Sequence, residues 1–369
     1  MNSPGRRIAA LRELSGTFGA EGPRRPSLHR SRPVAWVDVA ALAAELGVGG
    51  ALWSAVPDGQ AGLPLRAREQ LAMAHLADTA RNLRFRRGLV EAVQALNDAG
   101  ITPLLFKGSL ALVDGTLPDL GDRWMVDLDL AISAGQTGGA GAVLVDLGYI
   151  PEPGAPFLHP HELPYYRWRS GPIELHVELG SPPMPSVLPA SEAWADSSEV
   201  YVGSGVARGL SRTHQVLHNI VHSAVQDLNH EVGGLPLRQL LELSRLVRVH
   251  GAAVDWALIK GRLDEHGLGR ELRDHLWLAH RFAGMPLPDG AWPGRARWHE
   301  RRVIGSFALA WPPHVHRNLR FAFGPAYLDS LYGHGNRPVH LAAARIRHAA
   351  RLLRHDGRRV IRDVRARRS

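Results

Sequence analysis

Apolar side chains recur with helical spacing over much of the first hundred residues. The strongest segment, Leu65 to Ala99, has an apolar residue at every third to fifth position through most of its length and is interrupted at Gly88. Such a face predicts a long helix packed on a core. Its apolar positions are Ala72, Leu76, Ala80, Leu83, Val90, Val93 and Leu96. Residues 34–56 predict one or two shorter helices. Residues 1–32 are rich in Gly, Pro, Arg and Ser and predict a flexible N-terminus.

The pattern changes at Ile101, where short runs of strand type take over. The runs ITPLLF and WMVDLDLAI predict strands that flank a Lys-Gly-Ser turn and the helix that it opens. Two later segments, PYYRWRSGPIELHVEL and EVYVGSGVARGL, predict hairpins. The helical period returns at Ser211 and continues through several further segments.

These periods predict an α+β fold, in which a unit of short strands with its own helices is flanked by helical regions at both ends. The predicted division of the chain is a flexible N-terminus at 1–32, a helical region at 33–100, an α/β core at 101–210, a helical domain at 211–340 and a basic, helical tail at 341–369.

Composition and charge narrow the class of protein. The chain has no cysteine, which excludes a disulfide framework and cysteine-bound metals. Neither a secretory signal nor an apolar run of membrane-spanning length is present, so a cytoplasmic protein without a membrane span is predicted. Ten arginines and two aspartates lie between Leu341 and Ser369, so the tail carries nearly all of the net charge of +9. Such a tail is either a solvated terminus or a site for an anionic partner, RNA or a membrane surface.

Two acidic residues alternate with apolar residues in the run VDLDLAI. In a strand, Asp127 and Asp129 project to the same side, while the apolar residues between them face the core. A second strand, IELHVEL, places Glu174, Glu178 and His176 on one face in the same way. If the two strands pair, carboxylates from both converge, which is the arrangement that a hard divalent cation requires. The alternative is an ordinary solvent-facing strand.

Groups suited to phosphate lie near these acids. Gly108 allows close approach of the backbone, Ser109 offers a hydroxyl at a helix start, and Lys107 and Arg123 supply positive charge. Carboxylates that hold Mg²⁺ or Mn²⁺, together with such groups, suit the transfer of a group from a nucleoside triphosphate such as ATP.

The order of these segments resembles that of the polymerase-beta-like nucleotidyltransferases. The motifs KGSLAL, Arg123 four residues before Asp127, VDLDLAI and IELHVEL resemble more closely an uncharacterised bacterial nucleotidyltransferase family, over roughly residues 35–285. The resemblance implies a nucleotidyltransferase-type mixed sheet, with Asp127, Asp129 and Glu174 as catalytic metal ligands. It also implies that Lys107, Gly108, Ser109 and Arg123 bind the nucleotide. Two features depart from the pattern, a longer segment before Asp127 and a glutamate as third acid.

The resemblance leaves the acceptor open, as a small molecule, a peptide or protein, or RNA. Two other functions are compatible with the sequence: an inactive binding module that uses the basic tail, and a toxin-like nucleotidyltransferase that acts on tRNA. Downstream, His214, His218 and His222 are spaced four residues apart on one helical face. The first and third lie about 12 Å apart along a helix, so the three cannot share one ion. With His176, they are candidates for lining a substrate cleft.

Overall fold

The computed structural model describes residues 3–20, 35–57, 63–152, 162–168, 170–290, 296–308, 328, 340–348 and 350. The chain divides into two units, residues 1–311 and residues 312–369. The predicted regions 33–100 and 101–210, and residues 211–311, all lie in the first unit. They are therefore parts of one compact body.

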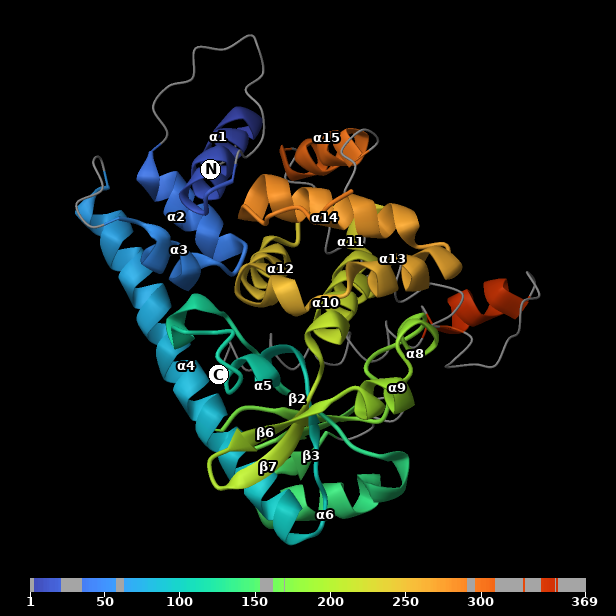
Figure 1. Ribbon diagram of the computed structural model, residues 1–369. Coiled ribbons are helices and arrows are strands. Elements are labelled where there is room, and N and C mark those ends of the chain that lie inside the picture. The colour runs from blue at the N-terminus through green and yellow to red at the C-terminus, as the bar shows by residue number, and fades with distance from the viewer. Residues whose placement is uncertain are drawn as a thin grey trace. The chain divides into compact units, whose positions relative to one another are not determined.

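The strands of the first unit form a seven-stranded mixed sheet, in the lower half of the view in Figure 1. Its strand order is β3-β4-β5-β2-β1-β7-β6. The strands are β1 (Leu104–Leu105), β2 (Leu128–Ala131), β3 (Ile150–Pro151), β4 (Glu162–Tyr166), β5 (Ile173–His176), β6 (Ser198–Val202) and β7 (Gly205–Gly209). The pairs β2–β5 and β1–β7 are parallel and the others antiparallel. The predicted α+β fold with a mixed sheet is confirmed, and both predicted hairpins, β4–β5 and β6–β7, are present.

Along the chain, helices precede the strands, lie between them and follow them. The N-terminal helices are α1 (Pro4–Thr17), α2 (Trp36–Glu45), α3 (Gly49–Ala55) and α4 (Leu65–Asp98). Those between the strands are α5 (Lys107–Ala111), α6 (Thr137–Asp146), α8 (Met184–Val187) and α9 (Ala190–Ala195). Those that follow are α10 (Arg212–Ile220), α11 (Asn229–Val232), α12 (Leu237–His250), α13 (Trp256–Glu265), α14 (Gly269–Ala283) and α15 (Ala296–Ala308), with a π-helical turn, Val221–Gln226, after α10.

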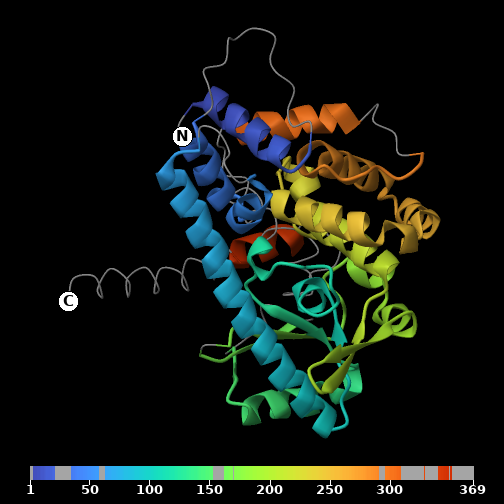
Figure 2. The same cartoon turned by 60° about the vertical axis from the view of Figure 1, so that its left-hand side comes forward.

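The long helix α4 runs beside the other N-terminal helices and then along the sheet (Figure 2). It continues through Gly88, where a Cβ atom would lie 3.3 Å from the Tyr149 hydroxyl. Its buried face differs from the predicted one, because Leu76 and Leu83 are 60% and 52% exposed. Asn82 is buried instead, and its side-chain amide donates hydrogen bonds to the backbone carbonyls of Leu120 and Arg123. The helix thereby holds the segment that leads into β2.

The prediction of a flexible N-terminus is wrong for residues 4–17, which form α1. The Ser3 hydroxyl accepts a hydrogen bond from the Arg6 amide and caps this helix, and Pro4 fits its first turn. Leu11 and Leu14 are fully buried. A composition rich in Gly and Arg hid a short amphipathic helix whose stability comes from packing rather than propensity.

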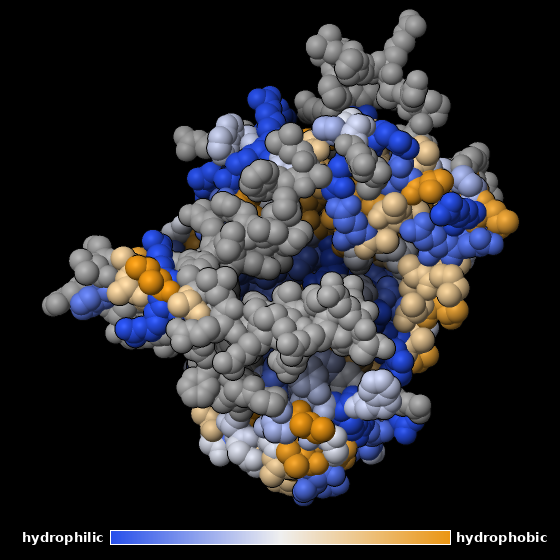
Figure 3. All heavy atoms as spheres, turned by 180° about the vertical axis from the view of Figure 1, so that it is seen from behind, coloured by the Kyte–Doolittle hydropathy of each residue, from blue (hydrophilic) through white to orange (hydrophobic). Residues whose placement is uncertain are grey.

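Most of the predicted tail, residues 341–369, lies outside the described residues. The described segment 340–348 is helical. Among the described helices, none is long and apolar enough to cross a membrane. Seen from the face opposite to that of Figure 1, the described surface is hollowed near its centre, and hydrophilic residues lie in the hollow (Figure 3).

Candidate active site

The acidic residues of two strands meet at the middle of the sheet. Strand β2 pairs in parallel with β5, so Asp129 lies beside Glu174, and Ala131 beside His176. The apolar neighbours Leu128 and Leu130 are fully buried on the other side. The predicted pairing of these two strands is therefore present, and it brings their acids together.

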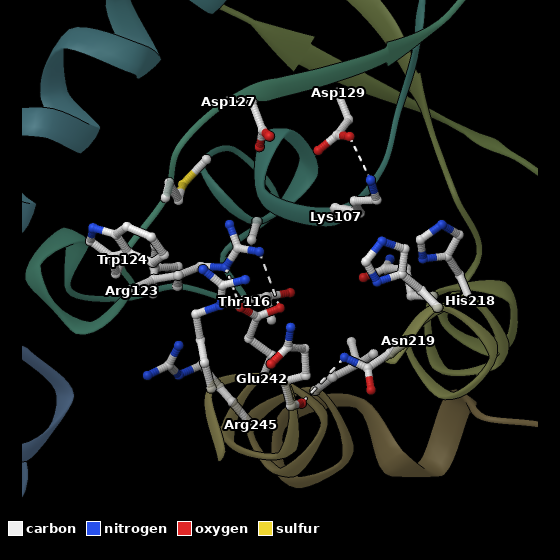
Figure 4. A pocket seen from close by; sticks show the side chains of 18 of the residues that line it. Lys107, Thr116, Arg123, Trp124, Asp127, Asp129, His218, Asn219, Glu242 and Arg245 are labelled. Carbon is white, nitrogen blue, oxygen red and sulfur yellow. Dashed lines mark hydrogen bonds and ion pairs between the residues drawn. The ribbon is translucent and has the colours of Figure 1, made fainter. Parts of the chain in front are cut away.

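Three of these side chains form a compact group of metal-ligand type. One ligand atom each from Asp129, Glu174 and His176 lies within 4.8 Å of the other two. His176 Nε2 is 3.1 Å from Asp129 Oδ1 and 3.7 Å from Glu174 Oε2. Asp127 is outside this group, but it lines the same cavity as Asp129 and Glu174, which is described below (Figure 4). Carboxylate oxygens this close together fit a hard divalent cation, with Asp127 as a further oxygen ligand.

Asp127 and Asp129 have opposite pKa shifts. Burial acts to raise the pKa of Asp129, but the Lys107 ammonium, 2.7 Å away, and the hydrogen bond with His176 hold it far below its usual range. Burial and the negative charge of Asp129 raise the pKa of Asp127 to about 6, against the attraction of Lys107 and Arg123. Two neighbouring carboxylates that share a site behave in this way because both cannot ionise at low cost. At pH 7 both carboxylates are therefore ionised, and the charge on Asp127 destabilises the fold unless a cation offsets it.

A cavity of about 290 Å³ opens in front of these acids. The sheet side contributes Lys107, Asp127, Asp129 and Glu174. The opposite side is formed by α10 and α12, as Figure 4 shows for Asn219, Glu242 and Arg245. Its size is at the lower end of the range for small-molecule sites in proteins.

Comparison with protein families assigns most of the chain. Residues 32–284 match the model of an uncharacterised nucleotidyltransferase family. The chain belongs to this family. Comparison with curated proteins and with solved structures gave no match. The resemblance inferred from the motifs around Lys107, Asp127 and Glu174 is therefore confirmed, and the general activity of this protein is nucleotidyl transfer.

Of the Lys-Gly-Ser turn of this nucleotidyltransferase, Lys107 lines the cavity, whereas Gly108 and Ser109 do not. Lys107, with a positive φ of 47°, joins β1 to α5 and extends its ammonium group to Asp129. A Cβ atom at Gly108 would lie 2.0 Å from Arg123 Nη1, so the glycine makes room for the arginine. Ser109 is fully buried and does not line the cavity. The structure thus brings Lys107 to the acids, with Gly108 beneath Arg123.

Arg123 connects the turn to α12. Its Nε lies 3.0 Å from Glu242 Oε1, and its Nη2 donates to Glu242 Oε2 at 3.1 Å. Burial acts to lower the pKa of Arg123, but Glu242 more than offsets this and the pKa is raised. Burial acts to raise the pKa of Glu242, and Arg123 and Arg238 lower it. Both groups are therefore charged, and the pair joins the sheet to the helical layer.

The cavity residues of α12 are missing from the sequence-based predictions. Arg238, Glu242 and Arg245 face the cavity at a spacing of four and three residues, whereas Leu240 and Leu243 are buried in the core. The signal was an amphipathic helix whose polar face carries charge of both signs. That signal alone does not separate a cavity wall from a solvated surface.

The candidate histidines divide between two places. His218 and His222 line the cavity, with ring centroids 5.6 Å apart. Burial holds the pKa of His218 well below its usual range, so its imidazole is neutral, and its Nε2 donates to the Leu179 carbonyl. His214 lies elsewhere, 3.5 Å from both Glu192 and Asp196. The structure therefore places His218 and His222 in the cleft, with His176 behind the acids, and does not bring His214 there.

Asp127→Asn is expected to stabilise the metal-free protein at pH 7. The pKa rises from 3.8 to about 6 on folding, so the native state holds the proton more tightly than the unfolded chain. Stability therefore falls as pH rises from 3.8 to 6, and the penalty persists above that window; its upper limit is about 3 kcal/mol. Thermal denaturation in the presence of a chelator measures the effect, which should vanish near pH 4.

The matched control is Asp146→Asn, an exposed acid at the end of α6. We expect it to change stability by less than about 0.5 kcal/mol at either pH. A melting temperature of Asp127→Asn below that of the wild type at pH 7 would contradict the burial argument.

Proposed function

We propose that this protein uses Mg²⁺ or Mn²⁺ to transfer a nucleotidyl group from a nucleoside triphosphate to a hydroxyl group of an acceptor, with release of pyrophosphate. The observation that carries the proposal is the meeting of Asp129 and Glu174 at one cavity, with Asp127 pointing into it. Lys107 and Arg123 line the same space and supply the positive charge that a phosphate chain requires.

The residues divide the chemistry between them. Asp127, Asp129 and Glu174 would hold the cation, and the bound cation would neutralise charge on the phosphates during the transfer. The acceptor oxygen attacks the α-phosphorus as the bond to the bridging oxygen of pyrophosphate breaks. Glu174, the least buried member of its cluster with 23% of its side chain exposed, takes the proton of the attacking hydroxyl. Lys107, which donates to Asp129 in the absence of a cation, would be available to the phosphates when that carboxylate holds the metal.

Labelled nucleotides test this proposal and identify the acceptor. The full chain is incubated with each of four α-phosphate-labelled nucleoside triphosphates, Mg²⁺ or Mn²⁺, and a cell extract. We expect label in an acceptor, pyrophosphate in equal amount, and no transfer with a chelator. Label in a small molecule, in protein or in RNA then gives the acceptor class, and label confined to tRNA favours the toxin-like function. No transfer with any nucleotide would reject the enzyme in favour of a binding module.

A further inference from the structure

The cavity has one acidic and one basic wall. On the sheet side, Asp127, Asp129 and Glu174 face one lysine, Lys107. On the other side, α12 contributes Arg238, Arg245 and one lining carboxylate, Glu242. The guanidinium of Arg123 reaches Glu242 from the segment before β2. A metal–polyphosphate complex would be complementary to such a division, because the carboxylates would hold the cation while the arginines meet phosphate oxygens.

The three arginines differ in how fully their charge is matched. Arg123 is held by two short contacts with Glu242. Arg238 Nε is 3.9 Å from Glu242, and Arg245 Nη2 is 3.6 Å from Asp122. Both distances exceed those of a hydrogen bond, and within the described part of the chain neither guanidinium makes one. Each therefore retains donors for a ligand.

Both side chains are half-buried. The Arg238 guanidinium stacks over the Trp124 ring, with its central carbon 5.0 Å from the ring centroid. Arg245 has 20% of its side chain exposed, and burial lowers its pKa in spite of Asp122 and Glu242. Partly desolvated arginines on one helix that line a cavity and keep spare donors have the chemistry that binds phosphate oxygens.

Two of the residues that the sequence predicts to bind phosphate do not lie on the basic wall. Ser109 is fully buried and lies off the cavity, and Gly108 packs under Arg123. We propose that Arg238 and Arg245 of α12, rather than Gly108 and Ser109, bind the terminal phosphates of the nucleoside triphosphate. This inference rests on the proposed function. It makes α12 the element that distinguishes a triphosphate from a monophosphate.

Calorimetry with the full chain tests the assignment directly. The probes are inorganic tripolyphosphate, ATP and AMP, each with Mg²⁺. Arg238→Ala and Arg245→Ala should each weaken tripolyphosphate and ATP binding about 10-fold, and the double variant about 100-fold, because each removes a charge-assisted contact. AMP binding should stay within about twofold, since AMP lacks the terminal phosphates. Mn²⁺ binding without nucleotide, followed by electron paramagnetic resonance, should not change.

Arg248→Ala is the matched control, because Arg248 is exposed on the same helix and does not line the cavity. Its tripolyphosphate affinity should equal that of the wild type. Arg238→Lys keeps the charge and should recover part of the tripolyphosphate affinity that Arg238→Ala loses. The melting temperature of each variant shows whether it is folded. Unchanged affinity in the double variant, equal losses in Arg248→Ala, or no tripolyphosphate binding by the wild type would overturn the assignment, as would a loss that follows Ser109→Ala alone.

The two proposals fail in different ways. Tripolyphosphate binding that depends on Arg238 and Arg245, without transfer of label to any acceptor, would count against the proposed function and retain the phosphate site. Transfer of label with affinity unaffected by the double variant would retain the function and reject this assignment.

Discussion

Asp129→Asn is expected to lower nucleotidyl transfer by at least about 10³-fold, equivalent to roughly 4 kcal/mol of transition-state stabilisation. Asp129 is 2% exposed, and its carboxylate contacts both Lys107 and His176. It also belongs to the group of possible metal ligands with Glu174 and His176. An amide keeps its shape but removes the charge and one strong oxygen ligand, so the cation would be held weakly. The measurement is the rate of label transfer at saturating nucleotide and metal.

Glu178→Gln provides the matched control for this variant. Glu178 follows the same strand segment as Glu174 but does not line the cavity. It undergoes the same carboxylate-to-amide change, and we expect transfer within about twofold of the wild type. Near-normal transfer by a folded Asp129→Asn protein would mean that the acids of β2 do not hold the reacting cation.

The acid cluster was the most predictable part of this site. Alternation in VDLDLAI fixes which side chains share a face, and a second alternating strand supplies a partner acid. The register Asp129 beside Glu174 follows once β2 and β5 pair. Both hairpins were predictable for the same reason, since a period of two and a glycine turn are local signals.

The opposite wall of the cavity could not be predicted, because it depends on which polar helix face meets the sheet. Arg238 and Arg245 have the sequence pattern of any solvated helix until α12 is placed across from Asp127. The same dependence made Leu76 and Leu83 appear buried and Ser109 appear accessible. Tertiary packing decided each of these positions, and no local pattern reports it.

Glu242→Ala is expected to lower the free energy of unfolding by about 3–5 kcal/mol. The change leaves the Arg123 guanidinium, with 13% of its side chain exposed, without its two contacts in the interior. Gly108 packs against that guanidinium and Asn82 holds its backbone carbonyl, so Arg123 cannot easily turn toward solvent. Chemical denaturation at pH 7 measures the loss.

The Glu192–Arg262 pair offers a comparison with the same bidentate geometry, both contacts being 2.9 Å, at a more exposed place. Glu192→Ala should cost no more than about 1 kcal/mol, because water can solvate the freed arginine. In the double variant Arg123→Met/Glu242→Leu, most of the stability should return, since neither buried charge remains, whereas transfer should stay low without the Arg123 charge. Equal small losses in Glu242→Ala and Glu192→Ala would show that Arg123 finds solvent, and that the joint between the sheet and α12 does not depend on this ion pair.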